Sequence, residues 1–239
     1  MQTFPNAVET RAFINAFKAA WEISVTEYEF RRINGEHTLQ ASLYRHMSDR
    51  LDAKKGYRIF TEASVLRGDL KSEDKNKLVR SEIDILVVHQ SSDNTPSVVV
   101  GAVELKFKSR GAPTENEVRT DLTRLSSIAN RRKKDLRSKL YMHRMLSEDK
   151  KPEEFLILPQ KRLIFAAFCN SDHSAIEKRI NPNHFWSAHK PKKGRWENQR
   201  HWPPHLGVAL AKTKPVPEGR KNCEGLTVKE YFGGAFKID

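Results

Sequence analysis

Apolar residues recur at two different spacings along the chain, and the change between them sets the predicted order of elements. Over residues 7–22 they recur every three to four positions, as in Phe13, Phe17 and Trp21. The same spacing continues over residues 36–51 after the Asn-Gly break that precedes it. This period is typical of amphipathic helices, so the chain is predicted to begin with two of them.

The period then shortens to that of β-strands. Residues 57–65, 82–89 and 98–108 are rich in valine, isoleucine and phenylalanine, and polar or charged stretches separate them. Such runs predict three strands that pair in one sheet, the last two as a hairpin or as near neighbours.

The second half of the chain alternates between the two patterns. Helical spacing predicts a long helix over 117–145, and apolar runs predict strands at 155–158, 162–170 and 206–212. The resulting order of helices and strands favours an α/β fold with a mixed central sheet that has helices on both faces. We expect residues 1–170 to form the core with its N-terminal helices, and the basic, tryptophan-rich residues 171–239 to pack on the same domain.

The charge balance points to a polyanionic partner. The 239 residues carry a formal net charge of +13, with a sequence pI near 9.8. Such a basic protein attracts nucleic acid, the commonest polyanion in a cell, although high charge also serves solubility alone.

Cysteine usage and hydropathy indicate the cellular compartment in which the protein is expected. Cys169 and Cys223 show no spacing typical of zinc ligands, and a disulfide scaffold is not expected from two cysteines. No signal-peptide pattern and no membrane-spanning apolar run occurs in the sequence. The prediction is therefore a cytoplasmic protein without a membrane partner.

Charged residues interrupt two of the apolar strand runs. Asp84 lies within the run of the second strand, and Glu104 and Lys106 lie within that of the third. Because side chains alternate along a strand, Glu104 and Lys106 share one face of the sheet while Leu105 faces the other. Buried charges need partners or a metal ion, so three charged groups from neighbouring strands are expected to converge.

This trio suits phosphodiester hydrolysis. Carboxylates of Asp84 and Glu104 are ligands that Mg²⁺ accepts, together with water and a substrate phosphate, and Mn²⁺ can substitute for it. Lys106 can orient the attacking water or stabilise the charge that develops on the phosphate.

Asp84, followed after nineteen residues by Glu104-Leu105-Lys106, resembles the motif of the PD-(D/E)XK, or restriction-endonuclease-like, nuclease superfamily. The resemblance covers about residues 36–170 and implies that superfamily's core fold. It also implies metal binding by Asp84, by Glu104 and by the backbone carbonyl of Leu105, with Lys106 as the catalytic lysine. Many members add a glutamate from the preceding helix, a place that Glu36 fits.

The motif departs from the family pattern at Ile83, where a proline is usual. The alternative interpretation is structural: a buried Lys–Glu pair at the strand end, with Asp84 capping a turn. Among nearby acids, Glu82 is either an outer member of the site or a solvated strand-end charge. Some relatives in the nuclease superfamily carry an acid at a helix position similar to that of Asp121, but Asp121 is predicted to be an exposed acid on the long helix.

Two basic stretches are candidates for contact with nucleic acid. The first covers residues 131–139, and the second, residues 184–205, interleaves basic residues with tryptophans whose rings can stack on bases. Either stretch can instead be structural, as the solvated face of a helix or as a segment anchored on the core. The candidate binding residues are Arg131, Arg132, Lys133, Lys134, Lys192, Lys193, Arg195 and Trp196.

The function that the sequence favours is a Mg²⁺-dependent endonuclease acting on DNA, for restriction, defence, repair or mobile-element processing. An RNA or structure-specific nuclease is the first alternative, and a non-catalytic nucleic-acid-binding protein is the second. Cleavage of both DNA strands would favour a homodimer, because one site cuts one strand.

Overall fold

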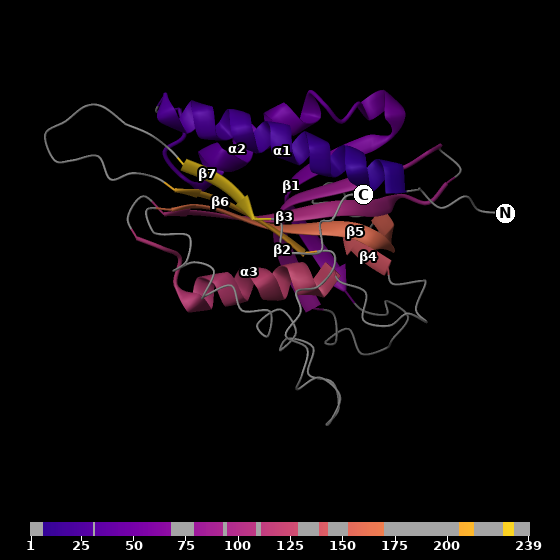
Figure 1. Cartoon of the computed structure of the whole chain (residues 1–239). Coiled ribbons are helices and arrows are strands. Elements are labelled where there is room, and N and C mark those ends of the chain that lie inside the picture. The colour runs from indigo at the N-terminus through magenta and orange to yellow at the C-terminus, as the bar shows by residue number, and fades with distance from the viewer. Residues whose placement is uncertain are drawn as a thin grey trace, which may run out of the picture.

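The protein has three layers, with a β-sheet between two layers of helices (Figure 1). Helices α1 (Ala7–Glu29) and α2 (Glu36–Ser48) cover one face, and helix α3 (Glu115–Ile128) covers the other. This arrangement confirms the predicted mixed α/β architecture. The computed structural model describes residues 7–30, 32–67, 79–92, 95–108, 111–128, 139–142, 153–169, 206–212 and 227–231.

Seven strands of the described residues form one mixed sheet, in the order β3-β2-β1-β4-β5-β6-β7. The pairs β3–β5 and β5–β6 are parallel, and the other pairs are antiparallel. A short 3₁₀ helix, η1, covers Ala53–Lys55. The strands are β1 (Tyr57–Arg67), β2 (Val79–His89), β3 (Val98–Lys108), β4 (Lys139–Met142), β5 (Glu153–Cys169), β6 (Leu206–Lys212) and β7 (Thr227–Tyr231).

The long helix predicted over 117–145 is wrong at residues 139–142, and residues 129–138 and 143–145 lie outside the described residues. Helix α3 ends at Ile128, and residues 139–142 form β4 instead. The backbone of β4 pairs with β1 on one side and with β5 on the other. Two strand edges therefore compete successfully with helix formation, although Leu140 fits either period.

The two strands predicted at 155–158 and 162–170 form the single strand β5. Its first part pairs with β4 and its second part pairs with β6, while β3 lies beside both parts. The polar break in the sequence lies where the neighbour of β5 changes from β4 to β6, and the backbone stays extended through it. Strand β7 was not predicted.

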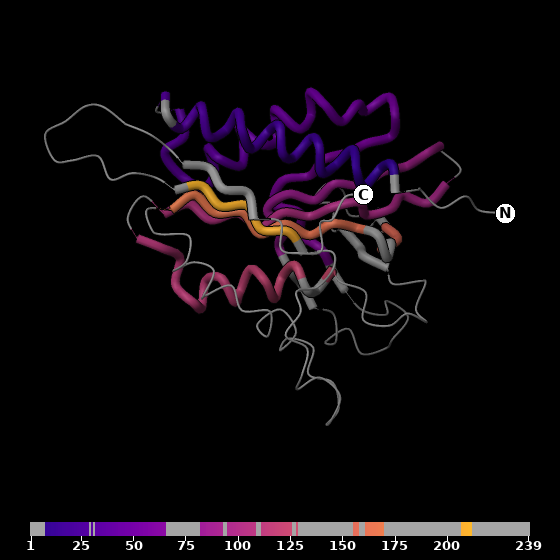
Figure 2. The backbone as a smooth tube through the Cα atoms, in the orientation of Figure 1, coloured from indigo at the N-terminus to yellow at the C-terminus, as the bar shows by residue number. Residues whose placement is uncertain are grey.

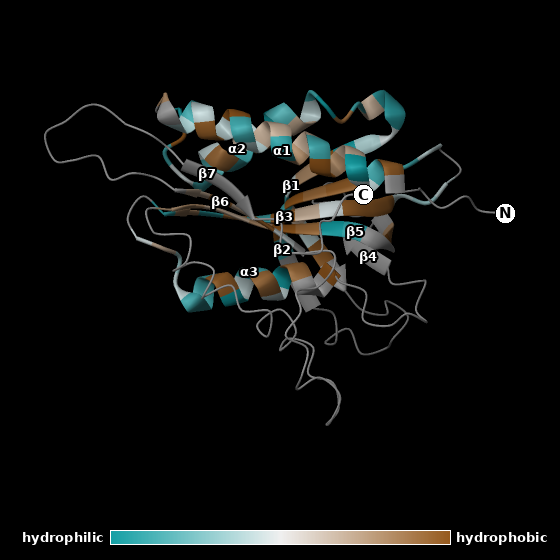
Figure 3. Ribbon diagram, in the orientation of Figure 1, coloured by the Kyte–Doolittle hydropathy of each residue, from teal (hydrophilic) through white to brown (hydrophobic). Residues whose placement is uncertain are grey.

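Each face of the sheet has its own hydrophobic core. Phe13, Phe17 and Trp21 of α1 are fully buried in the core shared with α2, and α3 contributes Val118 and Leu122 to the core on the opposite face. Figure 3 shows apolar residues concentrated in the central strands and mixed with polar residues along the helices. Burial of these two faces, the main favourable term in folding, fixes the sheet between the helices.

Helix α1 approaches β3 closely at Gly101. A Cβ atom at this position would lie 2.2 Å from Cε1 of Phe13. Glycine is therefore required there by the helix–sheet distance, and the contact ties α1 to the strand that carries Glu104 and Lys106.

Strands β1 and β2 exchange faces in the middle of their length. In β1, Tyr57 belongs to the core of α1 and α2, whereas Ala63 and Val65 belong to the core of α3. In β2, Ile85 and Ile83 differ in the same way. Between these positions lie Glu62 and Asp84, and Glu62 has a φ of +49°, which is unusual for a residue with a side chain.

Strand β4 joins the outer end of β1 to the beginning of β5, and β5 pairs with β3. The pairings of β1, β2, β3, β5 and β4 thus form a ring. Figure 2 traces the backbone of α1 and α2 on one side of the sheet and that of α3 on the other.

The described residues of the C-terminal region extend the same sheet. Strand β6 lies parallel to β5, and β7 pairs antiparallel with β6. Residues 171–205, which include the tryptophan-rich stretch, lie outside the described residues.

Candidate active site

Strands β2 and β3 separate at the positions of the two predicted metal-binding acids. Their register runs from His89 opposite Val98 to Ile85 opposite Val103. The next positions in that register are Asp84 and Glu104, and there the backbone ladder has ended. The Asp84 carboxylate takes the place of a strand partner, since its Oδ2 accepts a hydrogen bond from the Leu105 backbone N–H at 2.5 Å. Two acids therefore lie across from each other at the start of a seam between the strands.

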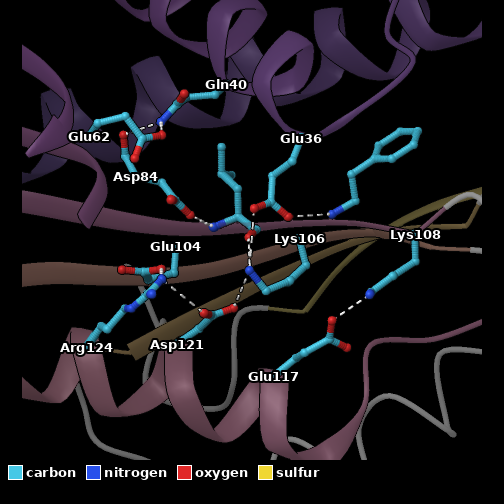
Figure 4. A network of polar contacts seen from close by, with 12 residues as sticks. Glu36, Gln40, Glu62, Asp84, Glu104, Lys106, Lys108, Glu117, Asp121 and Arg124 are labelled. Carbon is cyan, nitrogen blue, oxygen red and sulfur yellow. Dashed lines mark hydrogen bonds and ion pairs between the residues drawn. The ribbon is translucent and has the colours of Figure 1, made fainter. Parts of the chain in front are cut away.

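Helix α2 approaches the seam from one face. The Gln40 amide donates hydrogen bonds to the Glu62 carboxylate at 2.8 Å and to the Asp84 backbone carbonyl at 2.7 Å. One turn earlier, Glu36 accepts a hydrogen bond from the Phe107 backbone N–H at 3.2 Å. Helix α2 thereby holds the backbone of β2 and β3 on either side of the seam (Figure 4).

Helix α3 approaches from the other face and matches the charges of β3 one by one (Figure 4). Alternate residues of a strand and residues three or four apart on a helix have similar spacings, so the two rows coincide. The contacts are Arg124–Glu104 at 3.5 Å, Asp121–Lys106 at 3.1 Å, and Glu117–Lys108.

The Lys106 ammonium is held by both faces. Its Nζ lies 3.1 Å from an Asp121 oxygen, 3.5 Å from a Glu36 oxygen and 3.1 Å from the Leu105 carbonyl oxygen. Burial lowers the pKa of Lys106, but the Asp121 and Glu36 carboxylates outweigh that effect and raise it above its usual value. Lys106 is therefore a fixed cation at neutral pH.

The acids at the seam are held in an unfavourable environment for their charge. Burial raises the pKa of Glu104 well above its ordinary value, and repulsion from Asp84 and Asp121 adds to the effect. Burial likewise raises the pKa of Asp84, opposed by the hydrogen bond from Leu105. The Oε1 atom of Glu104 is buried and has no hydrogen-bond partner among the described residues. Such a cost is common at functional sites, where a bound ligand removes it.

The donor set fits one hard divalent cation. Mg²⁺ is bound by one or two carboxylates, with water and substrate oxygens completing its coordination. Asp84 and Glu104 supply two carboxylates, the orphaned Glu104 oxygen needs a partner, and the Leu105 carbonyl lies beside Lys106. The described part of the chain has no group of three or more His, Cys, Asp or Glu side chains placed to hold a metal ion.

The seam brings together every motif residue predicted from the sequence: Glu36, Asp84, Glu104, Leu105 and Lys106. The Lys–Glu pair of the structural alternative is present, with Glu36 as the glutamate. Lys106 pairs with Asp121 and Glu36, Glu104 pairs with Arg124, and the Asp84 carboxylate contacts a strand N–H.

The prediction that Asp121 is exposed is wrong, since only 1% of the residue is accessible. The signal was present in the sequence: Asp121 lies on the same arc of the helix as Val118, Leu122 and Leu125, all of which are buried. Arg124 and Gln40 were also missed, and no local pattern distinguishes them from surface residues. Glu82 is exposed on β2.

The predicted nucleic-acid-binding residues lie outside the described residues. They are Arg131, Arg132, Lys133, Lys134, Lys192, Lys193, Arg195 and Trp196.

Comparison with known proteins yields no relative: no family model, no curated protein and no solved structure matches the chain. Across the ranges that the structure describes, no helix is long and apolar enough to cross a membrane.

Proposed function

We propose that the protein is a Mg²⁺-dependent endonuclease with a restriction-endonuclease-like core, and that it acts on DNA. The observation that carries the proposal is the seam, where Asp84 and Glu104 lie across from each other beside Lys106 and one Glu104 oxygen lacks a partner. A protein that only binds nucleic acid gains nothing from buried carboxylates facing phosphate.

Each residue has a role in this proposal. Asp84 and Glu104, with the Leu105 carbonyl, hold the cation, and Glu36 is the additional acid next to it. A bound divalent cation lowers the pKa of a coordinated water and offsets negative charge on the phosphate. Lys106 orients the attacking water or stabilises the developing charge, a role that suits an amine with little freedom to move.

The basic residues of the two stretches supply contacts to the phosphate backbone, and Trp196 supplies a ring for base stacking. A net charge of +13 favours such a partner. We propose a homodimer for cleavage of both strands of a duplex, since each chain carries one seam.

The test is cleavage of plasmid DNA, linear duplex, single-stranded DNA and RNA with Mg²⁺, Mn²⁺ or EDTA. Wild-type protein is expected to nick or cut DNA only with a divalent cation. Asp84→Asn, Glu104→Gln and Lys106→Ala are each expected to lower the rate by about 100-fold or more, by loss of charge stabilisation in the transition state. Lys106→Ala is expected to retain DNA binding in a gel-shift assay.

Lys108→Ala is the matched control, because it removes an amine from the same face of the same strand, two residues beyond Lys106. It is expected to cut at the wild-type rate. Activity that survives EDTA would falsify the mechanism, and equal rates in all variants would assign the cutting to a contaminant. Cleavage of RNA alone would change the proposed substrate from DNA to RNA and would not contradict the proposed site.

A further inference from the structure

Asp121 of α3 is a buried carboxylate that the proposed hydrolytic trio does not include. Its side chain is 2% accessible, and it contacts two cations: Lys106 at 3.1 Å through Oδ2 and Arg124 at 3.7 Å through Oδ1. Burying a carboxylate is costly even when it is paired, and an apolar residue at this position would extend the adjoining core. A purely structural purpose therefore explains Asp121 poorly.

The position of Asp121 is set by packing rather than by side-chain flexibility. Val118, Leu122 and Leu125 fix the same side of α3 in the core below the sheet, so the short Asp121 side chain has little freedom. Lys106, in contrast, has a long side chain with several rotatable bonds. Contact with a fixed carboxylate selects one position for its amine, which would otherwise sample many.

Glu36 completes the restraint from the opposite layer. It contacts the Lys106 amine at 3.5 Å and accepts a hydrogen bond from the backbone N–H of Phe107. The Lys106 amine is thus clamped between a helix above the sheet and a helix below it (Figure 4). Reaction rates are sensitive to displacements of about 1 Å in a reacting group, on the order of 100-fold.

We propose that Asp121 is a positioning residue that fixes the Lys106 amine for catalysis without binding the metal ion itself. The inference rests on the proposed nuclease function. Arg124 assists by sharing the Asp121 charge, since its guanidinium also contacts Glu104 and so links the two ends of the network.

The test compares Asp121→Asn with Glu117→Gln. Glu117 forms the next pair of the same row, with Lys108, one turn earlier on the same helix, and its side chain is about one-third exposed, so its substitution removes a paired carboxylate of the same row outside the site. Three quantities are measured for each variant: kcat and KM for DNA cleavage, the Mn²⁺ affinity of the protein alone by titration calorimetry, and the midpoint of denaturant unfolding.

Asp121→Asn is expected to lower kcat by about 10- to 100-fold, while KM and Mn²⁺ affinity stay within about twofold of wild type. Glu117→Gln is expected to keep the wild-type kcat. In unfolding, the midpoint shifts of Asp121→Asn and Lys106→Met are expected to be non-additive in the double variant, because the two groups contact each other. Asp121→Ser provides a second neutral variant should Asp121→Asn fold poorly.

Several results would overturn the inference. A wild-type kcat in Asp121→Asn, or additive unfolding shifts, would show that Asp121 does not act through Lys106. A tenfold loss of Mn²⁺ affinity would make Asp121 a metal ligand instead. If wild-type protein cleaves no nucleic acid, the proposed function fails and this inference fails with it, whereas cleavage by the wild type isolates the role of Asp121.

Discussion

Glu104 lies in an environment that is costly for a carboxylate. Its side chain is fully buried, its pKa is raised by burial, and one of its oxygens has no partner within the described residues. The only ion pair that it forms there is the contact of 3.5 Å with Arg124, whose side chain is about one-third exposed. Under the proposed function, a bound cation would offset the cost of burying this charge.

We therefore predict opposite effects of Glu104→Gln on stability and on activity. The neutral amide keeps the shape and removes the buried charge, so the unfolding free energy of the metal-free protein at pH 7 is expected to rise by roughly 1 kcal/mol or more. Metal-dependent cleavage is expected to disappear. Chemical denaturation with and without Mn²⁺ measures both effects, since Mn²⁺ should stabilise only the wild type.

A lower unfolding midpoint in metal-free Glu104→Gln would contradict the prediction. It would show that Arg124 stabilises the Glu104 charge by more than burial costs. Glu117→Gln, which removes an acid that is about one-third exposed from the opposing helix, serves as the control for nonspecific effects of charge.

At the residue scale, the motif residues could be predicted from the sequence, but the residues that contact them could not. Asp84, Glu104 and Lys106 interrupt apolar runs, so they are conspicuous without a structure. Arg124 and Gln40 lie among polar residues of ordinary helices, and only the packing of those helices on the sheet brings them to the seam. To identify them, one must know the register of the strands and which helix packs on which face of the sheet, and local sequence patterns do not contain this information.

Helices α1 and α2 are joined by a buried polar network away from the seam. The Glu27 carboxylate accepts a hydrogen bond from the Ser42 hydroxyl at 2.6 Å and lies 3.2 Å from Nε2 of His46. The Ser42 hydroxyl also lies 2.7 Å from that of Ser24. Because α2 carries Glu36 and Gln40, this network helps to fix the layer that holds the seam.

The pKa of Glu27 is lowered, chiefly by the Ser42 hydrogen bond, which outweighs the opposing effect of burial. A carboxylate with a lowered pKa in the folded state contributes stability above its unfolded pKa, about 4.5, and loses it as the pH falls through the folded pKa. We predict that Glu27→Gln lowers the unfolding free energy by about 1–3 kcal/mol at pH 7, where the charged hydrogen bond is intact.

That difference from wild type is expected to shrink steadily below about pH 4.5, and urea denaturation across pH 3–7 measures it. Glu22→Gln, on the exposed side of the same helix, is expected to show no such dependence. A difference that stays constant over the whole range would exclude the charge of Glu27 as its source.

At the element scale, long and strongly periodic segments were predicted well. The β3 and β6 limits agree with the structure, and the first two helices begin where predicted. The prediction failed where contacts with other strands decide the secondary structure. Residues 139–142 pair with β1 and β5, and β5 continues through a polar interruption at which its pairing with β3 skips residues 158–161.

The whole molecule is strongly basic, and its charge leads to a measurable prediction. Binding of DNA releases condensed counterions, so the logarithm of the affinity should fall linearly with the logarithm of the salt concentration. Lys192, Lys193 and Arg195 lie in the tryptophan-rich stretch. Their joint substitution by glutamine is expected to reduce the slope by about 2–3 units if all three contact phosphates.

Fluorescence anisotropy with labelled duplex at several salt concentrations gives the slope, and EDTA keeps the DNA intact during the titration. Substitution of Lys54, Lys55 and Lys18 by glutamine removes the same charge from η1 and α1, as the control. Equal slopes for the two triple variants would assign the effect to overall charge rather than to the tryptophan-rich stretch.

The ring of strand pairings has a mechanical consequence for the seam. Strand β4 pairs with the outer end of β1 on one side and with β5 on the other. These pairings hold β1 and β2 in place, so β2 does not extend its pairing with β3 beyond Val103. The separation of β2 from β3 beyond Ile85 and Val103 is thus built into the closed ring of pairings. A ligand that bound at the seam would not have to break backbone hydrogen bonds between these two strands, because their ladder has already ended there.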